Sequence, residues 1–241
     1  MSTIPARPIV FLSDFGLGNE WVGICHSVMS AISPSSPIVD LSHLIRPFEV
    51  ASAALLLADS MPYIAENAVI VAVVDPEVGK DREVAIRTPS GRDLVGPDNG
   101  LLSLAWEAAG GVETAVEITS PEVTRPPRAQ SFRAPDTLCP ATAYLAAGRP
   151  LDDLGPVVAP DSLATVTIAE PEMEDGKIEC EVIDFNRFGN RPAERSGEGS
   201  GRSRPRRALD LTRRGDVRLG RREARCHVRG FHCGRVRLDL R

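Results

Sequence analysis

The chain has 241 residues, of which 42% are hydrophobic and 25% are charged, a composition typical of a globular protein with a sizeable core. No apolar run reaches the ~18 residues of a membrane-spanning helix and no signal peptide is recognisable, so we expect a cytoplasmic protein with reduced cysteines and no membrane partner. The net charge of −5 is uneven, since residues 191–241 carry 16 Arg against 6 acidic residues while residues 1–190 are acidic.

Strands and helices alternate in the predicted pattern up to about residue 150. In chain order we expect a strand over 8–13, a helix over 20–32, a strand over 37–41, a helix over 48–61, a strand over 67–74, a hairpin over 83–96, a helix over 99–110, a strand over 114–119 and a helix over 136–148. Continuous apolar strands are typical of a parallel sheet covered on both faces. The sequence therefore predicts an α/β fold whose N-terminal domain has a mainly parallel sheet flanked by helices. Two alternating runs, 162–170 and 177–184, predict strands of a more exposed sheet.

Asp14 directly follows the first apolar strand, in the stretch "IVFLSDFGLGNEWVG". The Asp-Phe-Gly triplet is not that of a protein kinase, because only thirteen residues precede Asp14. A dinucleotide fingerprint is excluded as well, since the third glycine is missing and an acid would repel a pyrophosphate. A carboxylate at the carboxyl end of a parallel strand suits a ribose diol or a cation, and capping of the next helix is an equally weighted alternative.

Asp75 follows the third predicted strand, in "VVDPEVGKDREVAIRT", and Arg82 lies seven residues further on. The intervening turn contains Pro76 and Gly79, and we expect it to bring the Arg82 guanidinium back to the Asp75 carboxylate. Such a pair could orient and polarise a water molecule. The alternative is a salt bridge that only holds the loop together.

Six ordered motifs carry a specific resemblance: "SDFGLG…VG", "IVDLSH…PFEV", "VVDPEVG…R", "VGPDNGLLSL", "YLAAGRPLDDLG" and "RFGN". From about residue 8 to Asn190 the chain resembles the S-adenosyl-L-methionine hydroxide adenosyltransferase family, which is related to fluorinating and chlorinating enzymes. The resemblance implies an N-terminal α/β domain, a smaller C-terminal β-barrel and a homotrimer that binds substrate between neighbouring subunits. The implied reaction converts S-adenosyl-L-methionine and water to adenosine and L-methionine, with no cofactor.

The resemblance also implies roles for individual residues. Asp14 would hold the ribose hydroxyls, and Asp75 and Arg82 would be two members of the family's water-activating Asp-Arg-His set. The further substrate-binding residues expected are Asn19, Trp21, Phe48, Asn186 and Asn190, the last in contact with adenine. The halogenating relatives carry tyrosine where this chain has Asp75, which favours hydroxide chemistry over halide chemistry.

Two site positions depart from the family pattern. Arg133, in "SFRAPD", stands where the family has the catalytic histidine, and it is kept here as the third catalytic candidate. Arginine cannot accept a proton at neutral pH, although it could help to hold a hydroxide. Asn186, in "NRFGN", replaces a family aspartate and would bind a substrate ammonium group more weakly.

The pattern stops after Asn190, and the composition of residues 191–241 predicts disorder or a shifted reading frame. Codons for Arg-Pro-Ala-Glu, read one nucleotide later, can encode Val-Gln-Leu-Asn, which the family would show after "FGN". We therefore predict three parts: an adenosyl-binding α/β domain over 1–160, a linker with the start of a β-domain over 161–190, and an Arg-rich tail over 191–241. The family's C-terminal β-barrel would then be absent or disrupted.

The remaining signals predict no metal and no specific nucleic acid. "CHVRGFHC" contains four possible zinc ligands, but its spacing matches no common zinc finger. The Arg clusters lack interleaved aromatic residues and a known binding module. The alternatives to a hydrolase with impaired activity are a non-catalytic adenosine or nucleotide binder and a halogenase, which Asp75 disfavours.

Overall fold

The computed structural model describes residues 6–126 and 132–168 with their side chains, and the backbone of seven strands between 172 and 240. The chain forms two compact units, Met1–Val166 and Thr167–Arg241. Among the helices of these described residues, none combines the length and hydropathy that crossing a bilayer requires.

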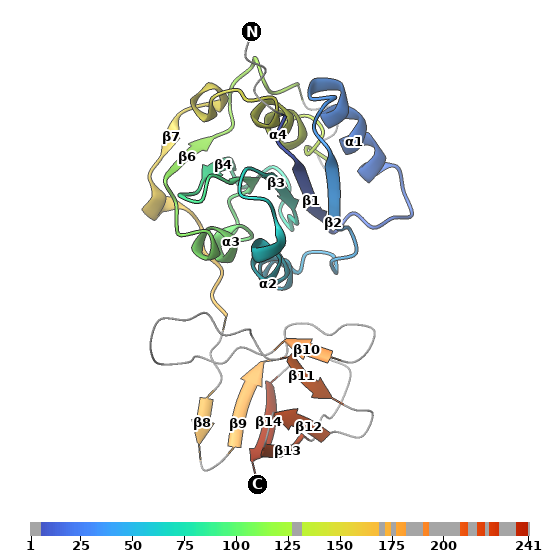
Figure 1. Ribbon diagram of the computed structural model, residues 1–241, viewed down its shortest axis with the longest axis vertical. Helices are drawn as coiled ribbons and strands as arrows, with labels where there is room; N and C mark the ends of the chain where they lie inside the picture. The colour runs from blue at the N-terminus through green and yellow to red at the C-terminus, as the bar shows by residue number, and fades with distance from the viewer. Residues whose placement is uncertain are drawn as a thin grey trace. The chain divides into compact units, whose positions relative to one another are not determined.

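The first unit is built on a seven-stranded sheet with the order β2-β1-β3-β5-β4-β6-β7 (Figure 1). The strands are β1 (Ile9–Ser13), β2 (Ile38–Ser42), β3 (Val69–Val73), β4 (Glu83–Arg87), β5 (Asp93–Pro97), β6 (Thr114–Glu117) and β7 (Val157–Val158). Strands β2, β1, β3 and β5 pair in parallel, whereas β4 is antiparallel to both of its neighbours and β7 is antiparallel to β6. The predicted α/β fold with a mainly parallel core is confirmed.

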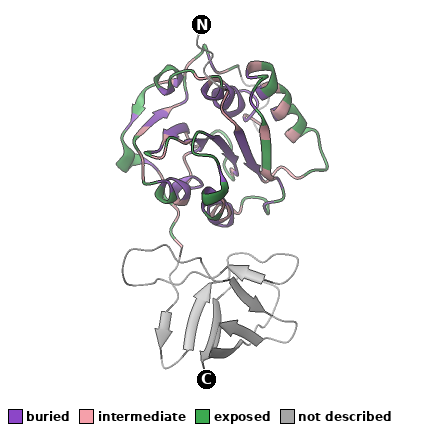
Figure 2. Ribbon diagram, viewed as in Figure 1, coloured by how far each residue is buried: buried purple, intermediate pink, exposed green. Residues whose placement is uncertain are grey.

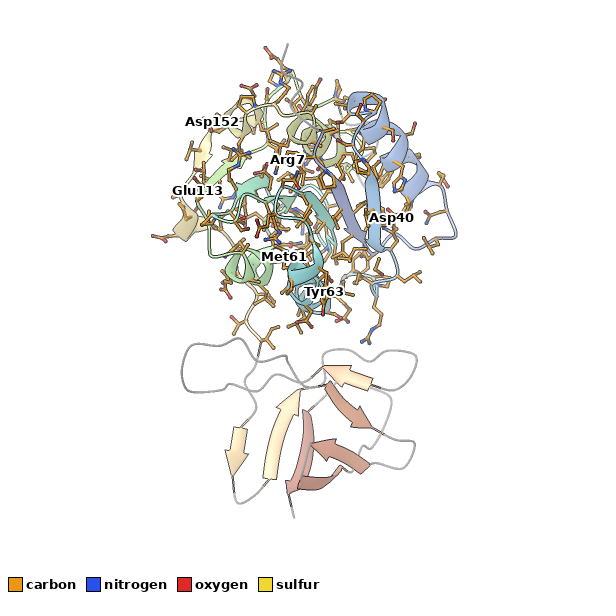
Figure 3. All side chains as sticks on the ribbon, in the orientation of Figure 1. Arg7, Asp40, Met61, Tyr63, Glu113 and Asp152 are labelled. Atoms are coloured by element: carbon orange, nitrogen blue, oxygen red, sulfur yellow. The ribbon has the colours of Figure 1, made fainter. Side chains whose placement is uncertain are left out.

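Helices cover both faces of this sheet. They are α1 (Trp21–Ile32), α2 (Val50–Ser60), α3 (Ser103–Ala108) and α4 (Leu138–Ala146), with short 3₁₀ helices η1 (Met61–Tyr63), η2 (Leu151–Leu154) and η3 (Pro160–Ser162). Residues of α1 and α4 share one apolar cluster and residues of α2 and α3 share the other. In η1, Met61 is buried whereas Tyr63 is 90% exposed (Figure 3).

Strand β1 shows why the apolar runs became central strands. Ile9 and Phe11 belong to the α1/α4 cluster, whereas Val10 and Leu12 belong to the α2/α3 cluster. Successive side chains of a strand point to opposite faces, so a strand covered on both sides must be apolar at every position. The buried centre of the sheet is visible in Figure 2. Each fully buried large side chain contributes about 1.5–3 kcal/mol.

The strand predicted over 162–170 is wrong for the part that the structure describes. Pro160–Ser162 form η3, and residues 163–168 have no strand. The backbone N–H of Ala164 donates to Asp98 Oδ1 at 2.8 Å, and that of Val166 donates to Ser103 Oγ at 3.1 Å. Side chains therefore satisfy the donors that a strand ladder would otherwise use.

The second unit contains a seven-stranded sheet with the order β10-β11-β12-β13-β14-β9-β8, in which the strand pairs are antiparallel. Its strands are β8 (Glu172–Glu174), β9 (Lys177–Glu181), β10 (Asn190–Pro192), β11 (Ala208–Leu211), β12 (Asp216–Leu219), β13 (Arg222–Cys226) and β14 (Arg235–Leu240). Strands β10 to β14 occupy the segment for which the sequence predicts disorder. Short alternating runs such as "RVRLDL" in β14 have the period of two that strand pairing favours.

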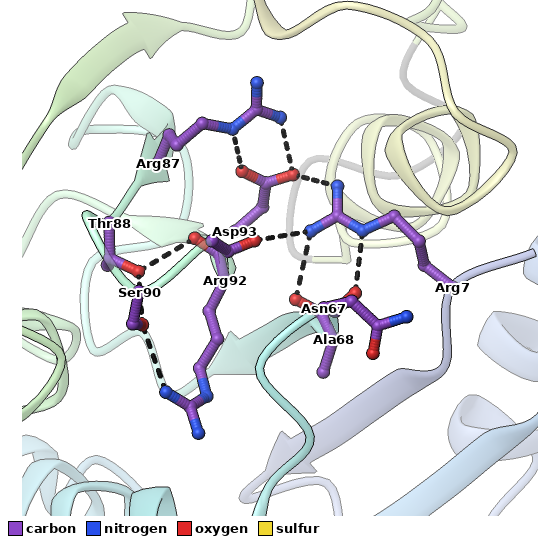
Figure 4. A network of polar contacts seen from close by, with 9 residues as sticks. Arg7, Asn67, Ala68, Arg87, Thr88, Ser90, Arg92 and Asp93 are labelled. Atoms are coloured by element: carbon purple, nitrogen blue, oxygen red, sulfur yellow. Dashed lines mark hydrogen bonds and ion pairs between the residues drawn. The ribbon is translucent and has the colours of Figure 1, made fainter.

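A buried ion-pair network fixes the edge of the first sheet at which the parallel strands begin (Figure 4). Asp93, the first residue of β5, is fully buried. Arg87 donates to both Asp93 carboxylate oxygens, at 2.8 and 2.9 Å, and Arg7 also pairs with Asp93. Arg7 further donates to the carbonyl oxygens of Asn67 (2.7 Å) and Ala68 (3.2 Å). The network thereby ties together the segments that lead into β1, β3 and β5.

We expect Asp93→Ala to destabilise the first unit by about 3–5 kcal/mol, because two arginines would lose a buried counter-charge. Urea unfolding followed by circular dichroism measures this change. The matched control is Asp153→Ala, whose i,i+4 partner Arg149 is 41% exposed and whose own side chain is 40% exposed. That exposed pair should contribute only about 0.2–1 kcal/mol. Equal losses in the two variants would contradict the role assigned to Asp93.

Candidate active site

Asp14 and Asp75 lie at the same edge of the sheet, as the sequence predicts. Strands β1 and β3 are parallel and in register, with Ser13 opposite Val73. The backbone N–H of Asp14 donates to the Val73 carbonyl at 3.3 Å. The negative charge of Asp14 is one of the causes that raise the pKa of Asp75, so the two carboxylates act on one another. This is the carboxyl edge, where α/β sheets bind ligands.

Asp14 holds the loop that follows β2. Its Oδ2 accepts a hydrogen bond from the Phe48 N–H at 3.0 Å. Phe48 has φ of +69°, a left-handed conformation that costs a non-glycine residue about 1–3 kcal/mol, and its side chain is 62% exposed. Burial raises the pKa of Asp14, although the hydrogen bonds from Phe48 and from its own backbone oppose the shift. Asp14 does not cap α1, whose N-cap residue is Glu20, and it stabilises a strained loop instead.

Asp75 lies in acidic surroundings. Burial is the largest cause of its raised pKa, and the charges of Asp81, Asp14 and Glu77 raise it further. The Glu77 N–H donates to Asp75 Oδ1 at 2.9 Å and opposes the shift. Several carboxylates at one edge attract a cationic ligand and repel an anion.

The predicted pairing of Arg82 with Asp75 is wrong. Arg82 Nε donates instead to Asp98 Oδ2 at 2.6 Å, and its Nη2 donates to the Ser162 carbonyl and hydroxyl oxygens at 2.6 and 3.0 Å. Asp98 follows β5 at the same carboxyl edge and is almost fully buried, so it competes successfully for the guanidinium. Arg82 therefore joins the turn after β3 to the end of the first unit.

Arg133 lies close to the Asp75 turn. Its Nη2 is 3.8 Å from Glu83 Oε2. Its side chain also lies over Gly79, where a Cβ atom would be in van der Waals contact with Nη1 and Cδ of Arg133, at 3.5 and 3.6 Å. Burial raises the pKa of Glu83. The charge of Arg133 and a hydrogen bond with Thr137 lower this pKa, and the charge of Asp75 raises it. Arg133, Glu83 and Asp75 are therefore electrostatically coupled. The structure thus brings Arg133 to the same turn as Asp75, whereas Arg82 is bound elsewhere.

Three aromatic rings adjoin the Asp14 loop. The Phe15 ring is 5.9 Å from that of Trp21 and 5.3 Å from that of Phe132, and Trp21 stacks on Phe132 at 5.3 Å. Trp21 is 40% exposed, so part of its surface is available to a ligand. Asn19 fixes the loop locally: its Nδ2 donates to the Phe15 carbonyl at 3.0 Å and its Oδ1 accepts the Trp21 N–H at 3.1 Å.

Two expected site residues are not placed by these contacts. Asn186 lies outside the described residues, and Asn190 is described only as backbone in β10. Glu83 and Asp98 were not predicted from the sequence to belong to the site. The position of Asp98 after a strand at the carboxyl edge, like that of Asp14, was the signal that could have identified it.

The chain is similar in sequence to enzymes of known activity. A (R)-S-adenosyl-L-methionine hydrolase from Salinispora arenicola is 40% identical over 76% of this chain and 69% of its own length. One from Thermus thermophilus is 38% identical over 76% of this chain and 72% of its own length. A fluorinase from Nocardia brasiliensis is 29% identical over 69% of this chain and 63% of its own length.

Solved structures show the same similarity. An uncharacterised conserved protein from Thermotoga maritima is 30% identical, with a TM-score of 0.71, over 77% of this chain and 70% of that one. A conserved hypothetical protein from Thermus thermophilus is also 30% identical, with a TM-score of 0.67, over 97% of this chain and 99% of that one. The family described as SAM hydroxide adenosyltransferase N-terminal domain matches residues 9–155, which is more than half of the chain. The chain therefore belongs to the SAM hydroxide adenosyltransferase family.

Proposed function

We propose that this chain is a hydrolase that cleaves S-adenosyl-L-methionine into adenosine and L-methionine. The observation that carries the proposal is the pair of half-buried carboxylates, Asp14 and Asp75, at the carboxyl edge of a sheet that belongs to this family. In the reaction, a bond forms between the water oxygen and C5′ as the bond between C5′ and sulfur breaks. The sulfur keeps the electron pair and leaves as the thioether of methionine, and the water proton passes to solvent.

The two carboxylates have different tasks in this proposal. Asp14 accepts hydrogen bonds from the ribose hydroxyls, while its other interaction holds Phe48 beside the site. Asp75 orients the attacking water toward C5′, and holding water in line with the reacting carbon lowers the entropic part of the barrier. The surrounding acids favour a sulfonium cation and disfavour a halide ion.

The remaining residues shape and orient the site. Arg82 fixes Asp98 and the segment around Ser162, so we propose that it positions the edge of the site and does not touch Asp75. Arg133 holds the turn that carries Asp75 through Glu83. Trp21 and Phe48 offer exposed aromatic surface to the substrate, and Asn19 fixes the loop between Asp14 and Trp21.

Other parts of the proposal come from the family resemblance. Asn190 would contact adenine and Asn186 the methionine end, in a homotrimer whose subunits complete one another's sites. The reaction needs no cofactor beyond its substrate. We place the enzyme in the cytoplasm, without a nucleic-acid or membrane partner.

Two alternatives remain as distinct outcomes of one experiment. A nucleotide binder without turnover is favoured by Arg133 and Asn186, which replace family side chains. A halogenase is disfavoured by Asp75, which would repel the halide. Incubation with S-adenosyl-L-methionine, with and without fluoride or chloride, followed by mass spectrometry separates them. Adenosine and methionine are expected; a 5′-halo nucleoside or binding without products would contradict the proposal.

One prediction concerns the protonation of Asp75. Its folded pKa lies above the unfolded value of 3.8, so the ionised carboxylate destabilises the fold and stability falls as pH rises through this range. Asp75→Asn should raise the thermal midpoint at about pH 7, lose this gain below about pH 3.8, and lower adenosine release at least ~100-fold. Asp153→Asn, at an exposed carboxylate, is the control for both measurements. A destabilised variant that keeps full turnover would refute the assigned role.

Another prediction tests the arginine at the family's histidine position. Arg133→His should raise adenosine release at least about 10-fold, because imidazole can accept a proton where guanidinium cannot. The rate should then acquire a pH limb near ~6.5, the ordinary pKa of histidine. Arg133→Gln is the matched control, since it removes the guanidinium without adding a base. If the glutamine variant gains as much as the histidine variant, proton acceptance is not what limits this chain.

The last prediction for this function concerns the tail. We propose that residues 191–241 are read in a shifted frame, which the change in Arg content supports. The sequence matches to three hydrolases cover 76 to 77% of the chain, close to the share that the motif-bearing segment 8–190 occupies, whereas the structural match to the Thermus thermophilus protein covers 97%. Resequencing around codon 190 should reveal an inserted nucleotide, and its deletion should give Val-Gln-Leu-Asn after Asn190. We expect the corrected chain to release adenosine faster and to resist protease better. A tail as written that is fully active and protease-resistant would contradict this proposal.

A further inference from the structure

Two histidines and an aspartate converge beside the candidate active site. His26 lies on α1, Asp40 lies on β2 at the edge of the sheet (Figure 3), and His43 directly follows β2. Nε2 of His26 is 2.7 Å from Asp40 Oδ1, and Nε2 of His43 is 3.0 Å from the same oxygen. One potential ligand atom from each residue lies within 4.8 Å of those of the other two.

The orientation of His43 is set by the residue before Asp14. His43 Nδ1 lies 2.7 Å from Ser13 Oγ, and the ring packs against Phe11 with a centroid distance of 4.6 Å. When Nδ1 donates its proton to this hydroxyl, the lone pair of Nε2 faces Asp40. A metal-binding histidine is commonly oriented in this way by a hydrogen bond from its other ring nitrogen.

The buried Nε2 of His43 is not satisfied by hydrogen bonding. It lies at ion-pair distance from Asp40 but has no partner with hydrogen-bond geometry among the described residues. His26 Nε2, by contrast, is hydrogen-bonded with Asp40 Oδ1 at 2.7 Å. Two Nε2 atoms thus approach one carboxylate oxygen, and a cation shared by the three groups would give the unsatisfied Nε2 of His43 a partner.

We propose that His26, Asp40 and His43 bind one divalent transition-metal ion, of which zinc is the representative. Two imidazoles and one carboxylate are a common ligand set for Zn²⁺ and chemically similar ions. The His43 side chain is 2% exposed, whereas those of His26 and Asp40 are 33% and 41% exposed. The ion is therefore reached from the solvent side, and water completes its coordination.

The proposed metal site does not depend on the proposed function. A bound ion would join α1, which carries His26, to the edge strand β2, which carries Asp40. The carbonyl oxygen of His43 accepts the N–H of Gly16 at 2.7 Å, and Ser13 precedes Asp14. The bound ion would therefore stabilise the loop that carries Asp14, while itself making no contact with the reacting atoms.

The test uses the full chain, stripped of metal by a chelator and dialysed, with the substitutions Cys226→Ser and Cys233→Ser to remove other candidate ligands. Cobalt(II) titration should give one bound ion with visible d–d bands and no thiolate charge-transfer band. His26→Gln and Asp40→Asn should each weaken binding at least about 10-fold. Both side chains are partly exposed, so the variants should fold, which circular dichroism checks.

The matched controls are His227→Gln and His232→Gln, which alter the other two histidines of the chain and should leave cobalt affinity unchanged. Zinc should raise the thermal midpoint of the parent chain but not that of His26→Gln. The proposal is overturned if the parent chain binds no cobalt. It is equally overturned if His26→Gln and Asp40→Asn bind cobalt as tightly as the parent, or if only the controls lose binding.

Discussion

The parallel pairing of β1 with β3 is the constraint on which the rest of the first unit depends. Each strand is buried on both faces, so neither can slide or turn over without exposing apolar side chains to water. Because the two strands are in register, the residues that follow them emerge at one edge. The proximity of Asp14 and Asp75 is therefore a consequence of packing in the core, and the loops that bear them need only continue in the strand direction.

Aspartate side chains have different surroundings at the two edges of the sheet. Asp93, at the edge where the parallel strands begin, is fully buried but paired with two arginines. Asp14 and Asp75, at the other edge, are half-buried, and burial raises the pKa of each while only backbone hydrogen bonds oppose the shift. A fold selected only for stability would have paired or removed these carboxylates, so their uncompensated charge is what marks the functional edge.

The sequence predicted the strands and the two acids because both signals are local: a continuous apolar run, then a carboxylate. It failed for Arg82, since spacing along a turn cannot decide between two carboxylates when Asp98 arrives from another strand. It also failed to find the group formed by His26, Asp40 and His43. That group depends on α1 packing beside β2, which no local pattern encodes. The family resemblance, by contrast, predicted the site position of Arg133, and its charge contact with Glu83 is consistent with that position.

The altered partner of Arg82 changes how this arginine is understood. A guanidinium on Asp75 would have lowered the pKa of that carboxylate and weakened it as a hydrogen-bond acceptor for water. Held by Asp98 and Ser162 instead, Arg82 leaves Asp75 among acids, with a raised pKa. The Asp98 carboxylate accepts Arg82 through Oδ2 and the Ala164 N–H through Oδ1. Arg82 thus leaves Asp75 without a positive partner while it anchors the last segment of the first unit, so in the proposed mechanism it acts on catalysis only through the shape of the site.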